Sequence, residues 1–283
     1  MRTVLFGLLT LFASTVTFAS ETDRLISKCT DTTMTEMLRN KLIDAEIIET
    51  PFPHLIIKDF FPDDFYHELV NHWPHPHQFN PKCNERYSIL LDELKRSQLT
   101  AKQKAFWGTF NSYLVETIVK PIIIKKFLCF LHVKFPDASP EELSQMVENF
   151  QPVANTNSIY LDTPSCSVPT HTDKPHCFVQ LIFYLPADND HQDVGTTFYA
   201  GSPHPGGENT CWDVPADLTY VKKLPYRKNT FIAFMQSPIS WHALEPSPYP
   251  GYLRRSFFSP ILMPPEIYIK HYGIEKYIIN YLE

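Results

Sequence analysis

Three residues in the second half of this 283-residue chain have side chains that together could hold a metal ion. His171 and Asp173 stand two positions apart. Residues i and i+2 of a β-strand project from the same face, about 6 to 7 Å apart, so this imidazole and carboxylate can point at one ion. His242 follows Asp173 by 69 residues, after another apolar run, and can supply a third ligand from a second strand. Two histidines and one carboxylate on one face of a metal leave coordination positions open for other molecules.

A second group follows His242 by twelve residues and consists of Arg254, Arg255 and Ser256. Alternation along a strand would place Arg254 and Ser256 on one face and Arg255 on the other. A guanidinium fork beside a hydroxyl is a natural clamp for a carboxylate, and it is stronger inside a low-dielectric barrel than on a surface. We therefore predict that Arg254 faces inward and that Arg255 faces outward.

The elements that position these residues change in character near residue 150. Before it, Thr100 with Gln103 and Ser139 with Glu142 form capping boxes that predict helices running towards residues 120 and 150. We expect residues 20–150 to form a mostly helical flank. The apolar stretch Ile122–Phe135 is interrupted by lysines, which predicts a buried helix with snorkelling lysine side chains.

After residue 150, short runs rich in β-branched and aromatic residues recur, separated by proline, glycine and aspartate. Short strands without intervening helices favour an antiparallel sandwich or jelly roll. We expect residues 151–283 to contain this strand-rich core followed by a C-terminal tail. The predicted strands are Ser158–Leu161, Val168–Asp173, Cys177–Leu185, Thr196–Ala200, Thr230–Met235, Trp241–Leu244 and Leu253–Met263.

Composition narrows the possible functions. The net charge is -6 and no dense Lys/Arg block occurs, so the chain has no electrostatic footprint for nucleic acid. Glycine is scarce at 8 residues and neither GxGxxG nor GxxxxGK[ST] occurs, so no phosphate-binding loop of these kinds is expected. The 25 prolines suit a barrel with many loops and edge positions.

The first nineteen residues have the composition of a secretory signal. Arg2 precedes an uncharged, largely apolar run that ends in small residues, which predicts cleavage after Ala19 and a periplasmic, extracellular or secretory-pathway location. An uncleaved signal anchor is the alternative, and no later segment qualifies as a membrane span. Six cysteines in the remaining chain would permit disulfides in an oxidising compartment, and the absence of CxxC argues against a ribbon-type zinc site.

The chain resembles the 2-oxoglutarate and iron(II)-dependent dioxygenases, in particular the branch of the prolyl hydroxylases and their bacterial relatives. The resemblance covers roughly residues 150–263 and extends back to about residue 51. An HxD pair, a distal histidine and Arg-x-Ser in this order and spacing form a specific combination. The segments that carry it are HTDKPHCFVQLIFYLP, GTTFY, NTFIAFMQSPISWHALEP, LRRSFF and the opening PFPHLIIKDFFPDDFYHELVNHWP.

This resemblance implies a double-stranded β-helix of the jelly-roll or cupin-like kind, with Fe(2+) bound by the facial triad. It also implies that 2-oxoglutarate and O2 are consumed while an unidentified small-molecule or peptidyl substrate is hydroxylated. Arg254 would bind the distal carboxylate of 2-oxoglutarate, assisted by Ser256, and Tyr184 and the weaker candidate Tyr160 would contact the co-substrate. The retained carboxylate of Asp173 favours hydroxylation over halogenation. The segment between the distal histidine and Arg254 is longer than in close prolyl hydroxylase relatives.

Two other functions fit the same residue pattern. One is a non-catalytic jelly-roll binding module that holds calcium or zinc for structural reasons. The other is a metal-dependent hydrolase in a cupin-like barrel. A binding module has no need of an inward-facing Arg254 beside an open coordination edge, so the position of that arginine separates it from an oxygenase. The loops 187–194 and 200–224, expected at the barrel mouth, do not reveal the substrate.

Overall fold

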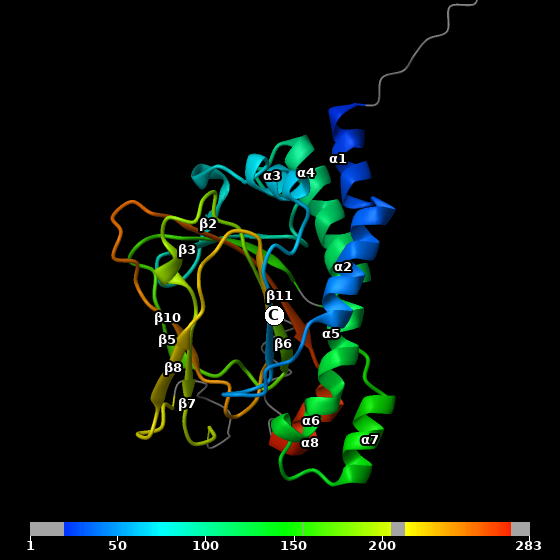
Figure 1. Ribbon diagram of the computed structural model, residues 1–283, viewed down its shortest axis with the longest axis vertical. Helices are drawn as coiled ribbons and strands as arrows, with labels where there is room; N and C mark the ends of the chain where they lie inside the picture. Colours follow the sequence, from blue (N-terminus) through cyan, green and yellow to red (C-terminus); the bar gives the residue numbers. More distant parts are fainter. Residues whose placement is uncertain (1–19, 155, 205–212, 273–283) are drawn as a thin grey trace, which may run out of the picture.

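The computed structural model describes residues 20–154, 156–204 and 213–272. Within these ranges, two antiparallel sheets face each other, and a layer of helices covers the outer face of the larger sheet (Figure 1). The predicted signal segment 1–19 and residues 273–283 of the predicted tail lie outside the described residues.

The larger sheet has seven strands in the order β1 (His54–Ile57), β9 (Thr230–Met235), β6 (Cys177–Tyr184), β11 (Arg254–Leu262), β4 (Ser158–Asp162), β3 (Arg86–Leu90) and β2 (Asn80–Pro81). The smaller sheet has the order β5 (Val168–His171), β10 (His242–Leu244), β7 (Thr197–Ala200) and β8 (Thr219–Lys223). From β4 to β11 the chain passes back and forth between the two sheets. This winding is that of a double-stranded β-helix, and it confirms the predicted fold.

The interior strand β6 packs against the hydrophobic core with one face and lines the inside of the barrel with the other. Every one of its residues is buried, because one face packs on the helices and the other faces the barrel interior. Leu181 and Phe183 belong to the core shared with the helical layer. Ile182 and Tyr184 belong to a second core inside the barrel. Because successive side chains along a strand point to opposite faces, β6 contributes to both cores and lies between them.

The helical layer is built mainly from the first half of the chain, and both predicted capping boxes are present, at Thr100 and at Ser139. A π-helical segment, η2, joins two α-helices into one long rod beside the sheet (Figure 1). The helices are α1 (Glu21–Cys29), α2 (Thr32–Asp44), α3 (Asp63–Asn71), α4 (Ala101–Thr109), η2 (Phe110–Val119), α5 (Lys120–Phe127), α6 (Leu131–Lys134), α7 (Pro140–Glu148) and α8 (Pro265–Tyr272), with short 3-10 turns η1 (Pro76–Gln78), η3 (Leu128–Phe130) and η4 (Gln192–Val194).

Four strands were not anticipated. The strands β1, β2 and β3 come from the expected helical flank and extend the larger sheet at both of its edges. The strand β8 falls in a stretch that was expected to be a loop, and its outward residues are exposed, so its sequence lacks a clear hydrophobic alternation.

One lysine of the apolar stretch differs from expectation, whereas Lys125 is exposed and Lys126 is half-buried, as the predicted snorkelling requires. Lys134 does not snorkel to the surface, because its side chain is completely buried and its Nζ donates to the Cys177 carbonyl at 2.9 Å. None of the helices in the described ranges has both the length and the apolar character needed to cross a membrane.

The five cysteines in those ranges are free thiols, so the possible disulfides are not found among them.

Candidate active site

The three predicted metal ligands converge at the end of the smaller sheet. His171 on β5 and His242 on β10 are directly paired across the two strands, and their ring centroids lie 4.2 Å apart. Asp173 follows β5 and places Oδ1 3.6 Å from Nε2 of His171 and Oδ2 3.9 Å from Nε2 of His242. One ligand atom from each residue lies within 4.8 Å of the others, so all three can reach a common ion.

Hydrogen bonds on the far side of each imidazole set the orientation of the two histidines. Nδ1 of His171 lies 2.8 Å from the Pro169 carbonyl, and Nδ1 of His242 lies 2.9 Å from the Ser240 carbonyl. A carbonyl accepts only, so each Nδ1 carries the proton and the lone pair resides on Nε2. Both Nε2 atoms point towards the carboxylate, which is the tautomer that a metal ligand requires.

The protonation states also suit a metal site. Burial, and then the neighbouring His171, lower the pKa of His242 to about 4, so its ring is neutral at physiological pH. Burial opposes ionisation of Asp173, yet the pKa of this carboxyl lies below its usual range, so the group is an anion at physiological pH. Its Oδ2 is buried and has no hydrogen-bond partner in the part of the chain that the structure describes. A divalent cation would satisfy this oxygen, and two imidazoles with one carboxylate suit iron(II).

Behind the triad, two side chains hold the backbone of Asp173. Nε2 of Gln236 donates to the Asp173 carbonyl at 2.7 Å, and Nζ of Lys134 donates to the side-chain carbonyl of Gln236. This chain of contacts ties the helical layer to the loop that carries the metal ligand. A lysine within an apolar helix is the one feature of the sequence that hinted at this chain of contacts.

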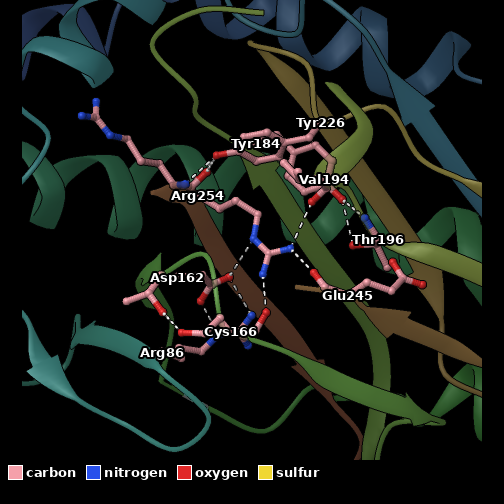
Figure 2. Close-up of polar contacts among 12 residues, drawn as sticks. Arg86, Asp162, Cys166, Tyr184, Val194, Thr196, Tyr226, Glu245 and Arg254 are labelled. Atoms are coloured by element: carbon pink, nitrogen blue, oxygen red, sulfur yellow. Dashed lines mark hydrogen bonds and ion pairs between the residues drawn. The ribbon is translucent and has the colours of Figure 1, made fainter. Parts of the chain in front are cut away.

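Arg254 lies inside the barrel with only 2% of its surface exposed, whereas Arg255 stands on the other face of β11, over the ring of Trp73. Nη1 of Arg254 donates to the carbonyls of Val194 and Glu245 at 3.2 and 2.9 Å, and Nη2 donates to the Cys166 carbonyl at 2.9 Å (Figure 2). Its Nε is buried and has no hydrogen-bond partner among the described residues. The guanidinium is therefore held by three backbone oxygens, while the Nε proton and one Nη2 proton remain unused.

The chain itself supplies a carboxylate to this arginine, which the sequence analysis did not anticipate. Oδ2 of Asp162 lies 3.9 Å from Nε of Arg254, and Arg86 binds the same carboxylate through Nε and Nη2 at 2.6 and 3.0 Å (Figure 2). The three residues occupy one row across β3, β4 and β11, directly opposite one another. Burial of Arg254 therefore does not by itself imply an absent anion. Arg86 was missed because it lies in the segment expected to be helical.

The three other predicted co-substrate residues form the next inward-facing row. Tyr160, Ser256 and Tyr184 are opposite one another on β4, β11 and β6. Oη of Tyr184 accepts a hydrogen bond from the backbone N–H of Thr196 at 2.8 Å and shares a second with the Thr196 hydroxyl. Oη of Tyr160 accepts from Nζ of Lys82 at 2.7 Å. Neither phenol hydrogen-bonds to Arg254 in this arrangement.

All seven residues predicted for the site line one cavity of about 260 Å³, together with Arg86 and Asp162. Apolar side chains from Ile182, Val194 and Phe258 complete its wall. Ligand pockets start at roughly 300 Å³, so this volume suits a small co-substrate more than a large ligand.

No protein-family model matches the chain, and no curated protein is similar to it in sequence. Solved structures with some similarity to this chain include the following three. A prolyl-4-hydroxylase from Pseudomonas putida has 13% identity and a TM-score of 0.43, with 82% of this chain and 100% of that chain covered. An oxidoreductase of the 2OG-Fe(II) oxygenase family from Burkholderia pseudomallei has 12% identity and a TM-score of 0.38, with 81% and 89% covered.

The third is the non-heme alpha ketoglutarate dependent epimerase SnoN from nogalamycin biosynthesis, with 12% identity, a TM-score of 0.42 and 82% and 84% of the two chains covered. Likeness at these identities concerns the fold, and the chemistry follows from the residues of this cavity.

Proposed function

We propose that the chain is a 2-oxoglutarate- and iron(II)-dependent dioxygenase that hydroxylates a small-molecule or peptidyl substrate. The observation that carries this proposal is the pairing of two unsatisfied groups in one cavity. Among the described residues, Oδ2 of Asp173 has no hydrogen bond within a metal-ligand cluster, and Nε of Arg254 has none on the neighbouring wall, although it lies 3.9 Å from Oδ2 of Asp162. A metal ion and a carboxylate are the respective groups that would satisfy them.

The charges in the cavity agree with a dianionic co-substrate. A divalent ion beside Asp173 leaves one net positive charge. Arg86 and Arg254 around Asp162 leave another. Buried charges are expensive unless they are compensated, so a cavity with two net positive charges favours a ligand with two negative ones. 2-Oxoglutarate carries two carboxylates.

The roles of the protein residues follow from their positions. His171, Asp173 and His242 would hold iron(II), which supplies the chemistry of O2 activation when bound. Arg254 would bind the distal carboxylate of 2-oxoglutarate, with the Ser256 hydroxyl on the same face of β11 beside it. Ile182, Val194 and Phe258 exclude water from the cavity, and this strengthens the contacts of the guanidinium.

The test is turnover of 2-oxoglutarate by the purified chain with iron(II) and O2, read as succinate produced, which can proceed slowly without the primary substrate. We expect His171→Ala to abolish metal binding and turnover. We expect Arg254→Gln to raise the KM for 2-oxoglutarate about 10- to 100-fold, because a charged hydrogen bond contributes about 1.5–3 kcal/mol. Iron affinity should change little.

Arg255→Gln is the matched control, since Arg255 neighbours Arg254 in sequence but stands on the opposite face of β11. It should behave like the unmodified chain. If Arg255→Gln loses co-substrate binding and Arg254→Gln keeps it, the assigned clamp is wrong. If the folded, iron-loaded chain binds no 2-oxoglutarate, the oxygenase proposal fails and a metal-stabilised binding module becomes the better account.

A further inference from the structure

Arg86 brings a second guanidinium to the same cavity from β3, near the edge of the larger sheet. Its Nε and Nη2 form one fork, and both are bound to the two oxygens of Asp162 (Figure 2). A guanidinium has five N–H donors arranged in two forks. Nη1, with the remaining proton of Nη2, forms the second fork, and Nη1 makes no hydrogen bond to the described residues. Arg86 can therefore donate hydrogen bonds to another carboxylate or phosphate without releasing Asp162.

Aromatic rings hold this guanidinium in place. Its Cζ lies 4.6 Å from the ring centroid of Tyr160 and 5.6 Å from that of Phe258. The two rings pack edge to face, with centroids 5.1 Å apart. A cation fixed by a carboxylate and two rings loses little conformational freedom when it binds a ligand.

A second cation, Lys82, is fixed beside Arg86. Its Nζ lies 4.8 Å from the ring centroid of Tyr160 and donates to the hydroxyl of that residue. Lys82 faces Arg86 across the β2–β3 turn, where the Lys82 N–H donates to the Arg86 carbonyl at 2.8 Å. The turn is anchored to the barrel because the Thr163 N–H donates to the Glu85 carbonyl at 3.1 Å. The backbone thus fixes the turn that carries both residues, and the exposed Lys82 side chain extends from it to the Tyr160 hydroxyl.

We propose that Arg86 and Lys82 form a subsite for an anionic group of the primary substrate, a carboxylate or a phosphate. This inference rests on the proposed function, because it takes the metal and Arg254 to be occupied by the co-substrate. With 2-oxoglutarate bound, the charges around the metal and Asp162 are balanced. Lys82 then adds a positive charge beside a guanidinium with an open fork, and an anionic substrate group neutralises it.

The probes are acetate and methyl phosphate, titrated calorimetrically under argon into the full chain loaded with iron(II) and saturated with 2-oxoglutarate. We expect saturable binding of at least one probe, and the tighter of the two identifies the anion class. Arg86→Gln should weaken that binding at least tenfold, Lys82→Gln about three- to tenfold, and Arg255→Gln less than twofold.

Because Asp162 is buried, Arg86→Gln could destabilise the fold. Arg86→Lys keeps the charge but removes the fork, and the double variant Arg86→Gln/Asp162→Asn removes both buried charges together. Both should bind the probe at least fivefold more weakly than the unmodified chain while retaining its circular dichroism spectrum.

Three outcomes would overturn the subsite: no saturable binding of either probe, equal binding by the unmodified chain and Arg86→Gln, or an equal loss of 2-oxoglutarate and probe affinity in Arg86→Gln. The last would assign Arg86 to the co-substrate clamp. Failure of the proposed function is a separate observation, since it is the absence of 2-oxoglutarate binding by the unmodified chain. In that case, the probe is titrated without 2-oxoglutarate. Weaker binding by Arg86→Gln than by the unmodified chain supports the subsite, and equal binding overturns it.

Discussion

At the residue scale, the site depends on buried polar groups, most of whose atoms have hydrogen-bond or ion-pair partners within the chain. Arg254 donates to three backbone carbonyls, and the carboxylate of Asp162 is shared between two arginines. The imidazoles of the triad are oriented by carbonyl acceptors two residues before each of them. These contacts keep the metal-facing atoms in position before any ligand arrives, which is the preorganisation that binding sites need.

The pH dependence of stability tests whether the buried Lys134 side chain is neutral in the folded chain. Burial lowers its pKa to about 7, well below the usual value for lysine. Between about pH 7 and 10.5 the unfolded chain therefore binds more protons at this position than the folded chain. The free energy of unfolding should consequently increase as the pH rises through that window and decrease as the pH falls through it.

The measurement is urea unfolding of the unmodified chain and of Lys134→Met at pH 8 and pH 9.5. One proton changes stability by at most about 1.4 kcal/mol per pH unit, so the difference between the two chains should shift by about 2 kcal/mol in favour of the unmodified one. A constant difference would mean that Lys134 stays charged, held by its carbonyl acceptors.

At the element scale, short runs of β-branched and aromatic residues predicted the buried strands, and the four strands that were missed lie at or next to a sheet edge. The strand Thr230–Met235 was predicted with its observed bounds, since all six of its residues are buried and apolar or β-branched. The strands β3 and β8 expose part of their residues, so their sequences carry a weaker pattern. On its outer side β3 pairs only with the two-residue β2, and β8 pairs only with β7.

The site divides in the same way. His171 and Asp173 could be found because they stand two positions apart, and Arg254 because it alternates with Arg255 and stands two positions before Ser256. His242 could be found because it follows these residues in the order that the family resemblance implies. The strand β5 ends at His171, so Asp173 reaches the site from the loop after it. Arg86 and Asp162 could not, since their proximity depends on the pairing of β3 with β4, which comes from residues far apart in the chain. Contacts across strands are set by the register of the sheet and not by local sequence.

Asn229 connects two elements that the sequence places far apart. Its side chain accepts from the Phe61 N–H and donates to the Phe61 carbonyl, both at 2.8 Å, and its backbone has a positive φ of 57°. Asn229→Ala should lower the free energy of unfolding by about 2–4 kcal/mol, through two lost hydrogen bonds and an unfavourable left-handed backbone. Urea denaturation checks this value.

Asn229→Gly separates the two causes, because glycine accepts the left-handed backbone without strain but lacks the amide. It should be more stable than Asn229→Ala by about 1 kcal/mol. Equal stability of the two variants would show that the backbone conformation contributes nothing.

At the scale of the whole molecule, the helical layer and the barrel share one core. Phe183 on β6 packs edge to face against Phe110 of the π-helical segment and Phe257 of β11, with centroids 6.0 and 5.5 Å away. The large sheet is thus apolar on the side that faces the helices, and neither layer could bury its surface alone. We expect the two layers to unfold together.

Phe183→Ala should therefore lower the stability of the whole fold by about 3–5 kcal/mol, as for other large-to-small changes at fully buried aromatic positions. Phe183→Leu, which keeps most of the volume, should lose less. Guanidinium denaturation followed by tryptophan fluorescence and by circular dichroism measures both. Separate transitions from the two probes would show that the layers are independent.

The double burial of β6 also has a consequence for how this protein could change over evolutionary time or in the laboratory. Every one of its residues is buried, so almost any substitution there disturbs the core or the wall of the cavity. The β2–β3 hairpin lies at the rim of the same sheet and still brings Arg86 to the cavity. New substrate preferences are therefore more accessible by rebuilding this hairpin, with the metal centre and the central strand left unaltered.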